Sequence, residues 1–486
     1  GGLADIGYLT ELLRNEGILP LDPGIDRLAI VGAFAEAPRF QGAGSSQVHP
    51  TRVDRLLDLV RERVGPRTEV TYAPGYDVES GATDPALLGE ALAAADGADV
   101  VVFCGGLPAP MESEGFDRTS LDLPDGHVAL IEALAARPAP VVVVLSNGGV
   151  VHLPWADRVE AVLEAWLGGQ AGAAGTVGIL FGDTEPGGRL AESIPVHVAQ
   201  LPADRNFPGL PRQVEHREGL AVGYRFHDAA EVPARFAFGH GLSFTTFDWT
   251  DAVIDGTGTD VRLTVTVTNT GDRPGSEVVQ VYVGDPESSV WRPPQELKGF
   301  AKVHLEPGAS EVVTVDLDRR AFAIWDVATR DWLVEGGDFE IVLARSSVDA
   351  VVRFVHPVES SDVVTPVPSP AHLVMDDDEF ESVLGRPIPV PPPVRPFHRN
   401  STLEDLETTW FGRFLGRQIV RAGLKEAEKE FPDPDAATQA MVRTALREGP
   451  ARSLVLLSGG KVPFVAVDLL IAALNRDRAA AARQGH

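Results

Sequence analysis

Short apolar runs rich in β-branched residues recur through the first third of the chain, and they limit the fold more than any other feature. Five runs have the length and content of buried strands: 27–33, 68–73, 99–104, 141–145 and 159–166. Four segments between or after these runs are predicted to be helices: 51–62, 87–95, 125–136 and 169–181. Such alternation is typical of a parallel sheet with helices on both faces. We therefore expect a doubly wound, mostly parallel α/β sandwich domain over residues 1–235.

The spacing of apolar residues changes to strict alternation beyond residue 250. Apolar and polar residues alternate over 261–267, and the same pattern returns at 279–283 and 313–317. Several short strands with turn residues between them indicate a β-sandwich. We place this domain at 236–358, where its Gly- and Phe-rich first residues connect it to the α/β domain.

Proline dominates the chain after the predicted sandwich. Residues 359–400 contain the run IPVPPPVRP and an acidic triplet, which is typical of a linker. The motif Ser-Thr-Leu-Glu at 401–404 has the pattern of a capping box and predicts a helix through about residue 422. With two further expected helices, 435–447 and 464–475, it makes residues 401–486 a small helical extension.

Charge and cysteine content exclude several classes of protein. The net charge of −28 argues against nucleic acid and against an anionic membrane surface as partners. Cys104 is the one cysteine, so no intrachain disulfide can form. A chain without disulfides fits a reducing compartment. The first residues lack the basic and apolar regions of a signal peptide. We expect a cytoplasmic protein, and we interpret a start on two glycines without Met as a fragment.

The loop after the third apolar run gathers polar side chains. A Gly- and Pro-rich segment, 105–110, precedes Glu112, Glu114, Asp117 and Arg118. In an open α/β sheet, ligands bind outside the carboxyl ends of the strands. Carboxylates on this loop have the position that an acid/base catalyst needs, but solvated loop acids would give the same composition. The residues alone leave both interpretations open.

Seven segments form an ordered series that is specific only as a set: LLRNEGILPL (12–21), RLAIVGAFAEAPRFQGAGSSQVHP (27–50), ESEGFDRTSLDLP (112–124), EGLAVGYRFHD (218–228), FAFGHGLSFTTF (236–247), NTGDRPGSEVVQVYV (269–283) and ELKGF (296–300). In this order they resemble glycoside hydrolase family 3, the β-glucosidase family, in the part that follows its catalytic barrel. The resemblance implies a fibronectin type III-like fold for the sandwich. The stretch HRNSTLEDL (398–406) is similar to extensions on some bacterial members.

The resemblance also implies a domain that we do not find in the sequence. Full members of the family begin with a (β/α)8 barrel that carries the nucleophilic Asp in a Ser-Asp-Trp context. No Ser-Asp-Trp occurs here, and the two Asp-Trp pairs, at 248–249 and 331–332, fall in the predicted sandwich. We expect these pairs to be structural, and we expect neither a (β/α)8 barrel nor a nucleophile in this chain.

The loop at 112–124 is the acid/base loop that the resemblance implies. Retaining hydrolysis needs two carboxyl groups about 5–5.5 Å apart, here one from each of two domains. Glu114 is the implied acid/base, since Gly115 lets the backbone turn and present it. Glu112, two residues away, is the alternative, and we expect only one of the two side chains to face the substrate. Asp117 and Arg118 are expected to form an ion pair that orients the loop.

Other polar residues have simpler interpretations. Ser45 and Ser46 either line the mouth of the cleft or cap the helix expected near residue 51. His152 and His240 stand near small or apolar neighbours, where a structural hydrogen bond is the simpler explanation. We find no cluster with metal-ligand spacing and no Gly-rich turn directly after the first strand. We therefore expect no metal and no cofactor.

These expectations give one functional hypothesis and one rival. The chain is expected to be part of a retaining, exo-acting β-glucosidase-type hydrolase that acts on a β-glucoside or oligosaccharide. It would supply the acid/base to a barrel domain that lies upstream or on a separate chain, and alone it would be nearly inactive. The rival is a non-catalytic carbohydrate-binding or scaffold module.

Overall fold

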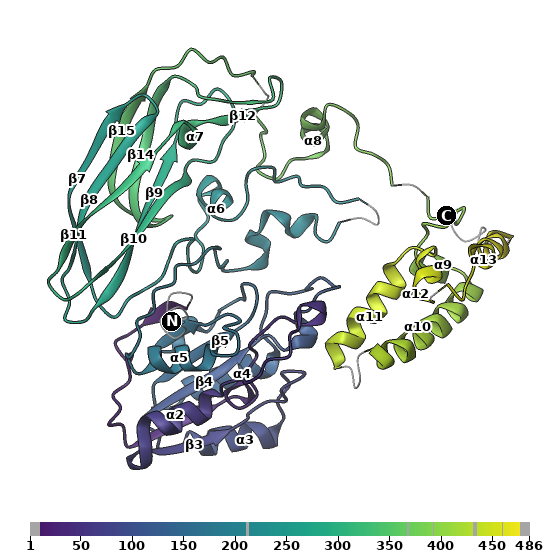
Figure 1. The fold of residues 1–486 in the computed structure, drawn as a ribbon, viewed down its shortest axis with the longest axis horizontal. Helices are drawn as coiled ribbons and strands as arrows, with labels where there is room; N and C mark the ends of the chain where they lie inside the picture. The colour runs from purple at the N-terminus through teal and green to yellow at the C-terminus, as the bar shows by residue number, and fades with distance from the viewer. Residues whose placement is uncertain are drawn as a thin grey trace.

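A computed structural model describes residues 10–209, 213–366, 369–391, 393–430, 435–458 and 460–476. Along the chain it shows an α/β domain, a β-sandwich, an extended linker and a helical unit (Figure 1). The helical unit lies beside the α/β domain, although the sandwich and the linker separate the two in sequence (Figure 1).

A six-stranded sheet forms the centre of the α/β domain. Its strands lie in the order β1-β6-β5-β4-β2-β3, with the bounds β1 Glu11–Asn15, β2 Arg27–Val31, β3 Glu69–Ala73, β4 Val100–Gly106, β5 Val141–Ser146 and β6 Ala161–Glu164. All neighbouring pairs are parallel except β1 with β6. The predicted, mostly parallel sheet is confirmed, and β4 is buried along its whole length because both faces are covered.

Four helices cover the sheet: α2 Leu56–Val64, α3 Pro85–Ala94, α4 Asp125–Ala135 and α5 Gly172–Leu180. α2 leads from β2 outward to β3, and α3 leads back past β2 to β4. Because parallel crossovers are right-handed, this reversal places α2 and α3 on opposite faces. α2 contacts α5 and α3 contacts α4. The arrangement is doubly wound, as the sequence predicted.

Two differences from the expected elements have local causes. The sequence does not predict β1, which is too short to show a pattern; it forms because Leu12 and Leu13 are buried while its backbone pairs with β6. The helix expected over 51–62 begins only at Leu56. The backbone N–H of Asp54 donates to the carbonyl of Gln170 (3.0 Å), which holds the preceding residues extended.

The predicted β-sandwich is also confirmed. One sheet has the order β10-β9-β14-β15 and the other β11-β8-β7, with the bounds β7 Phe247–Thr257, β8 Asp260–Asn269, β9 Gly275–Gly284, β10 Glu296–Leu305, β11 Ser310–Leu317, β14 Gly337–Ser346 and β15 Asp349–Val358. The alternating residues 261, 263, 265 and 267 all point into the core. This inward face explains the period of two. The connector contains α6 (Tyr224–Ala230).

Both Asp-Trp pairs lie in the sandwich. Trp249 is on β7, and Trp332 is on β13 (Asp331–Leu333), which pairs with β12 (Ile324–Asp326) after the short helix α7 (Arg319–Phe322). The Arg345 guanidinium lies 5.2 Å from the centre of a Trp249 ring, and that of Arg320 lies 3.4 Å from a Trp332 ring. These contacts support a structural role for the two tryptophans.

The last part of the described chain is helical: α8 Asp377–Leu384 lies in the linker, and the extension contains α9 Leu403–Glu407, α10 Trp410–Glu430, α11 Ala436–Glu448, α12 Ser453–Leu457 and α13 Phe464–Arg476. The single helix expected from 401 to 422 is divided between α9 and α10. Its capping box lies one residue later than predicted: Thr402 accepts from the N–H of Asp405 (3.0 Å), and Asp405 accepts from the N–H of Thr402 (2.8 Å). The linker also contains α8, which we did not predict.

None of the helices in the described parts of the chain combines the length and the apolar content that crossing a bilayer requires.

Cys104 is a free cysteine buried in β4. The residue is 4% exposed, and burial raises the pKa of the thiol to about 12. Since only the thiolate reacts readily, we expect the folded chain to resist iodoacetamide at about pH 8 and to react after denaturation. Mass spectrometry of the alkylated protein measures this. Rapid labelling of the folded chain would contradict the burial of β4.

Candidate active site

The carboxyl ends of β4 and β5 approach each other so closely that glycine is required where β4 ends. Gly106 has φ +152°, and a Cβ there would lie 2.0 Å from the carbonyl oxygen of Ser146. The N–H of Gly106 also donates to Nδ1 of His127 (3.3 Å). Burial lowers the pKa of His127 to about 3, so the ring stays neutral and can accept this bond. The chain therefore leaves the sheet at a fixed point. The loop that begins there, residues 107–124, includes the predicted segment 112–124 and is called the acid/base loop from here on.

Arg39 binds the start of this loop from the segment after β2. Its Nε donates to the carbonyl of Leu107 (3.2 Å), and its Nη2 donates to the carbonyl of Glu112 (3.0 Å). The side chain is 8% exposed. Burial lowers the pKa of Arg39, and the charge of Glu112 opposes that effect. A nearly buried guanidinium thus fixes the backbone that leads to the predicted acid/base.

Glu112 is occupied by contacts within the protein. Its Oε2 accepts from the backbone N–H of Gly148 (2.6 Å), just after β5. Its carboxylate also lies 3.9 Å from Nη2 of Arg39 and 3.9 Å from Nη1 of Arg118. With 17% of its side chain exposed, Glu112 joins three loops at one edge of the sheet.

Glu114 lies in a different environment, although only Ser113 separates it from Glu112. It is exposed, and its N–H contacts the carbonyl of Ala43 (3.4 Å). Gly115 follows with φ +95°, a conformation that side chains other than glycine rarely adopt. The sharp turn expected from this glycine is present. The two candidate carboxylates are therefore distinguished by burial.

The residues expected to orient the loop are only partly where we predicted. Arg118 contacts Glu112 and donates to the carbonyl of Val150 (3.0 Å), so its carboxylate partner is Glu112 where we expected the exposed Asp117. Ser46 is exposed in the 3-10 helix η2 (Gly44–Ser46), and its hydroxyl donates to the carbonyl of Ala43 (3.3 Å). It does not cap α2, whose N-cap is Arg55. Ser45 is in η2 as well, but its side chain lies outside the described part of the structure.

The two histidines make structural hydrogen bonds, as predicted. His152 contacts Asp122 through Nδ1 (3.1 Å) and the carbonyl of Val196 through Nε2. His240 contacts the carbonyl of Leu13 through Nε2 (2.9 Å), and burial lowers the pKa of its ring.

A buried pair of carboxyl groups lies at the same sheet edge, and the sequence analysis missed it. Glu164, at the end of β6, accepts from the side chain of Asn147 (3.2 Å) and from the N–H of Trp166 (3.2 Å). Glu11, on β1, accepts from the indole N–H of Trp166. Burial raises the pKa of Glu164 well above its usual range and raises that of Glu11 to about 7. Glu11 and Glu164 are both buried on their strands, and a search for alternating apolar residues does not detect a buried acid.

A small cavity opens between this cluster and Arg39. Its volume is about 40 Å³, and Phe40, Ser146 and Trp166 are among the residues that line it. A cavity needs about 10–15 Å³ of such space to hold one water molecule, so this one admits only a few waters. A sugar ring at this edge would therefore need further walls from outside the cavity.

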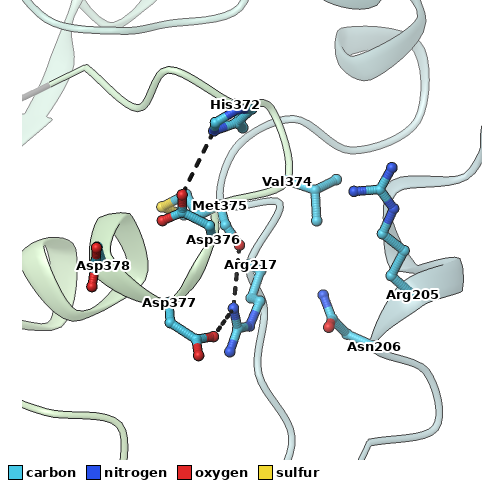
Figure 2. Close-up of a pocket in the computed structure, with 9 residues that line it drawn as sticks. All are labelled: Arg205, Asn206, Arg217, His372, Val374, Met375, Asp376, Asp377 and Asp378. Carbon is cyan, nitrogen blue, oxygen red and sulfur yellow. Dashed lines mark hydrogen bonds and ion pairs between the residues drawn. The ribbon is translucent and has the colours of Figure 1, made fainter.

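A larger hollow of about 630 Å³ lies between the linker and the residues Arg205, Asn206 and Arg217 (Figure 2). Arg217 pairs there with Asp377 (2.7 Å). His372, Asp376 and Glu379 have possible metal-ligand atoms within 4.8 Å of one another, a grouping that the sequence analysis overlooked. These groups serve to begin α8, because Glu379 accepts from the N–H of Asp376 (3.1 Å) and Asp376 accepts from that of Glu379 (3.0 Å). None of the acid/base loop lines this hollow.

Sequence reasoning also missed Arg39 and Gly148 as parts of the site. A signal was present: both follow apolar runs of the same parallel sheet, so they had to lie at the edge that carries the acid/base loop. Which of them contacts Glu112 depends on loop geometry that the sequence does not display.

A matched pair of variants tests the different environments of the two loop carboxylates. Glu112→Gln removes the charge that faces two arginines, one of them nearly buried, and should lower the free energy of unfolding by about 1–3 kcal/mol. Glu114→Gln, at an exposed site, should change it by less than about 0.5 kcal/mol. Urea unfolding followed by circular dichroism measures both. Equal losses would contradict the assignment.

The raised pKa of Glu11 predicts a pH dependence of stability. The folded chain keeps this proton up to about pH 7, whereas the unfolded chain loses it near its ordinary value of 4.5. Stability should therefore fall as the pH rises between these values, and Glu164 acts in the same direction. Glu11→Gln should reduce this fall and be the more stable form at about pH 8.

Urea unfolding at about pH 5 and about pH 8 measures the effect. Glu62→Gln, an exposed carboxylate on α2, is the control and should follow the wild-type pH dependence. A Glu11→Gln variant with an unchanged slope would show that Glu11 is ionised in the folded chain throughout this range.

Comparisons with known proteins agree with this architecture. The model of the glycosyl hydrolase family 3 C-terminal domain matches residues 10–244, and that of the fibronectin type III-like domain matches residues 277–347. These matches cover the α/β domain and most of the sandwich described above.

Relatives extend the match along the chain. Thermostable beta-glucosidase B of Acetivibrio thermocellus is 43% identical over 382 residues, 77% of this chain and 50% of the relative. An exo-alpha-(1->6)-L-arabinopyranosidase of Bifidobacterium breve is 41% identical over 466 residues, 94% of this chain and 56% of the relative. The second match reaches into the helical extension. The chain spans about half the length of these curated relatives.

Solved structures agree as well. The crystal structure of a Bifidobacterium adolescentis GH3 beta-glucosidase superposes with a TM-score of 0.71 at 38% identity, over 78% of this chain and 56% of that one. The order of the domains, the matched family models and these relatives lead to one conclusion. The chain belongs to glycoside hydrolase family 3 and carries the C-terminal α/β domain of that family, followed by its fibronectin type III-like domain.

Proposed function

We propose that this chain supplies the general acid/base of a retaining, exo-acting β-glucosidase-type hydrolase, with Glu114 in that role. The observation that supports the choice is the contrast between the two loop carboxylates. Glu112 is held by Arg39, Arg118 and the N–H of Gly148, whereas Glu114 is exposed at the carboxyl edge of the sheet. A group that must reach a substrate oxygen needs that exposure.

In the proposed mechanism, a carboxylate from a barrel domain attacks the anomeric carbon while Glu114 protonates the glycosidic oxygen. The leaving group departs, and the sugar stays bound to the nucleophile as an ester. Glu114, now ionised, then removes a proton from a water molecule that attacks the anomeric carbon and frees the nucleophile. This sequence requires the two carboxyl groups to lie about 5–5.5 Å apart.

The barrel would also complete the binding site. The cavity at the edge of the sheet is too small to enclose a sugar ring, so another domain must provide most of the walls. We propose that Arg118 orients the loop through Glu112, and that Asp117, Ser45 and Ser46 lie on the substrate side. Without the barrel the chain should be nearly inactive.

The test compares variants of this chain after a family 3 barrel domain is joined to it or added to it. Glu114→Ala should lower the rate on a glucoside with a poor leaving group by roughly 10²–10⁴-fold. A substrate with a good leaving group should lose much less, and azide should restore turnover. Glu90→Ala, an exposed carboxylate on α3, is the control.

An aryl β-glucoside and an aryl α-L-arabinopyranoside should both be assayed, since the relatives carry both names. An unchanged rate in Glu114→Ala would support the rival, a carbohydrate-binding or scaffold module. Full activity of the chain without a barrel would contradict the proposal altogether.

A further inference from the structure

Helix α11 of the C-terminal extension packs against the acid/base loop. It contacts η4 (Ala109–Met111), within that loop, and η2, the neighbouring turn that carries Ser46. Figure 1 shows the lower end of α11 beside the loops at the edge of the α/β domain. Three segments that are far apart in the sequence, 44–46, 109–111 and 436–448, thus meet near Glu114.

Met441 is the apolar centre of this contact. A Cβ on Gly115 would lie 2.9 Å from Cγ of Met441, and a Cβ on Gly44 would lie 3.2 Å from its Sδ. The same position on Gly44 is 3.0 Å from Cβ of Glu114. Met441, two glycines and the stem of Glu114 therefore form one tightly packed group. A flexible thioether side chain suits the irregular space between them.

Asp435 adds a polar contact at the start of α11. It caps the helix by accepting from the N–H of Thr438 (2.7 Å), and it also accepts from Nε2 of Gln47 (3.3 Å). Burial alone would raise the pKa of Asp435, but these hydrogen bonds and the charge of Arg39 hold it below its ordinary value. Arg39 in turn binds the backbone of the acid/base loop at Leu107 and Glu112. The extension therefore acts on the loop at two points.

We infer that α11 is a positioning element for the acid/base, and that Met441 is its principal positioning residue. The loop contains three prolines and Gly115, and its regular structure is one turn of 3-10 helix, so it depends on neighbours for a fixed shape. Loss of the contact would let Glu114 move while the rest of the α/β domain stays folded. The catalytic consequence rests on the proposed function of Glu114; the structural consequence does not.

The structural consequence is tested on the 486-residue chain by hydrogen exchange with mass spectrometry. Met441→Ala should make the amides of residues 107–119 exchange roughly tenfold faster. Met441→Leu, which keeps the volume, should exchange like the wild type. Arg443→Ala, exposed and two residues along the same helix, is the matched control. Gln47→Ala removes the polar contact from the α/β side without altering α11, and should have a smaller effect of the same kind.

Unchanged exchange of the loop in both Met441→Ala and Gln47→Ala would overturn the inference. If Met441→Ala unfolds the extension, the Gln47→Ala variant decides the question. Faster exchange of the loop in that variant supports the inference, and exchange at the wild-type rate overturns it.

The catalytic consequence is tested with the barrel domain supplied. Met441→Ala should lower kcat more for a poor leaving group than for a good one, with little change in KM, because protonation of the leaving group is the step that Glu114 performs. Equal losses for both leaving groups, or a change in KM alone, would overturn the positioning role. The exchange results stand even if Glu114→Ala shows that this glutamate is not the acid/base, so the two proposals fail separately.

Discussion

The candidate site depends on the contacts that the nearly buried guanidinium of Arg39 makes. This side chain extends from the segment after β2, binds two backbone carbonyls of the loop after β4, and faces the carboxylate of Glu112. Glu112 continues the connection to Gly148 after β5. Three loops that leave the sheet separately are thus held together by one cation and one anion. Breaking either side would leave the other charge poorly solvated, which is why such pairs are costly to disrupt.

This arrangement explains why two glutamates of one short loop differ. The carboxylate that contacts the arginines gives rigidity to the loop, and the next glutamate is carried to the surface by the turn at Gly115. A proton donor needs both features, a firm support and access to substrate. The helical extension contributes to the same support through Met441 and Asp435, so distant parts of the sequence converge on one loop.

Much of the fold was predictable because it is written in local patterns. Buried parallel strands are continuous apolar runs, and sandwich strands alternate, as 261–267 shows. Elements without such a pattern were missed: β1 depends on pairing with β6, and α8 begins with a capping box inside a proline-rich segment. The division of the helix expected at 401–422 was also missed. It lies at residues 408–409, where the hydroxyl of Thr409 donates to the carbonyl of Leu406 (2.9 Å) and accepts from the N–H of Gly412 (2.8 Å), and no pattern of apolar residues displays such contacts.

The sequence by itself determined the order of the domains, the loop that carries the candidate acid/base, and the resemblance to a family, because each is encoded in contiguous residues. Only the tertiary structure decided how the carboxylates of that loop are used. It pairs Arg118 with Glu112 where the sequence suggested Asp117, and it brings Arg39 and Met441 to the same place. These contacts join residues that are far apart along the chain. Their free energies depend on burial and on distance in space, and neither quantity exists until the sheet, the loops and the helical extension have packed together.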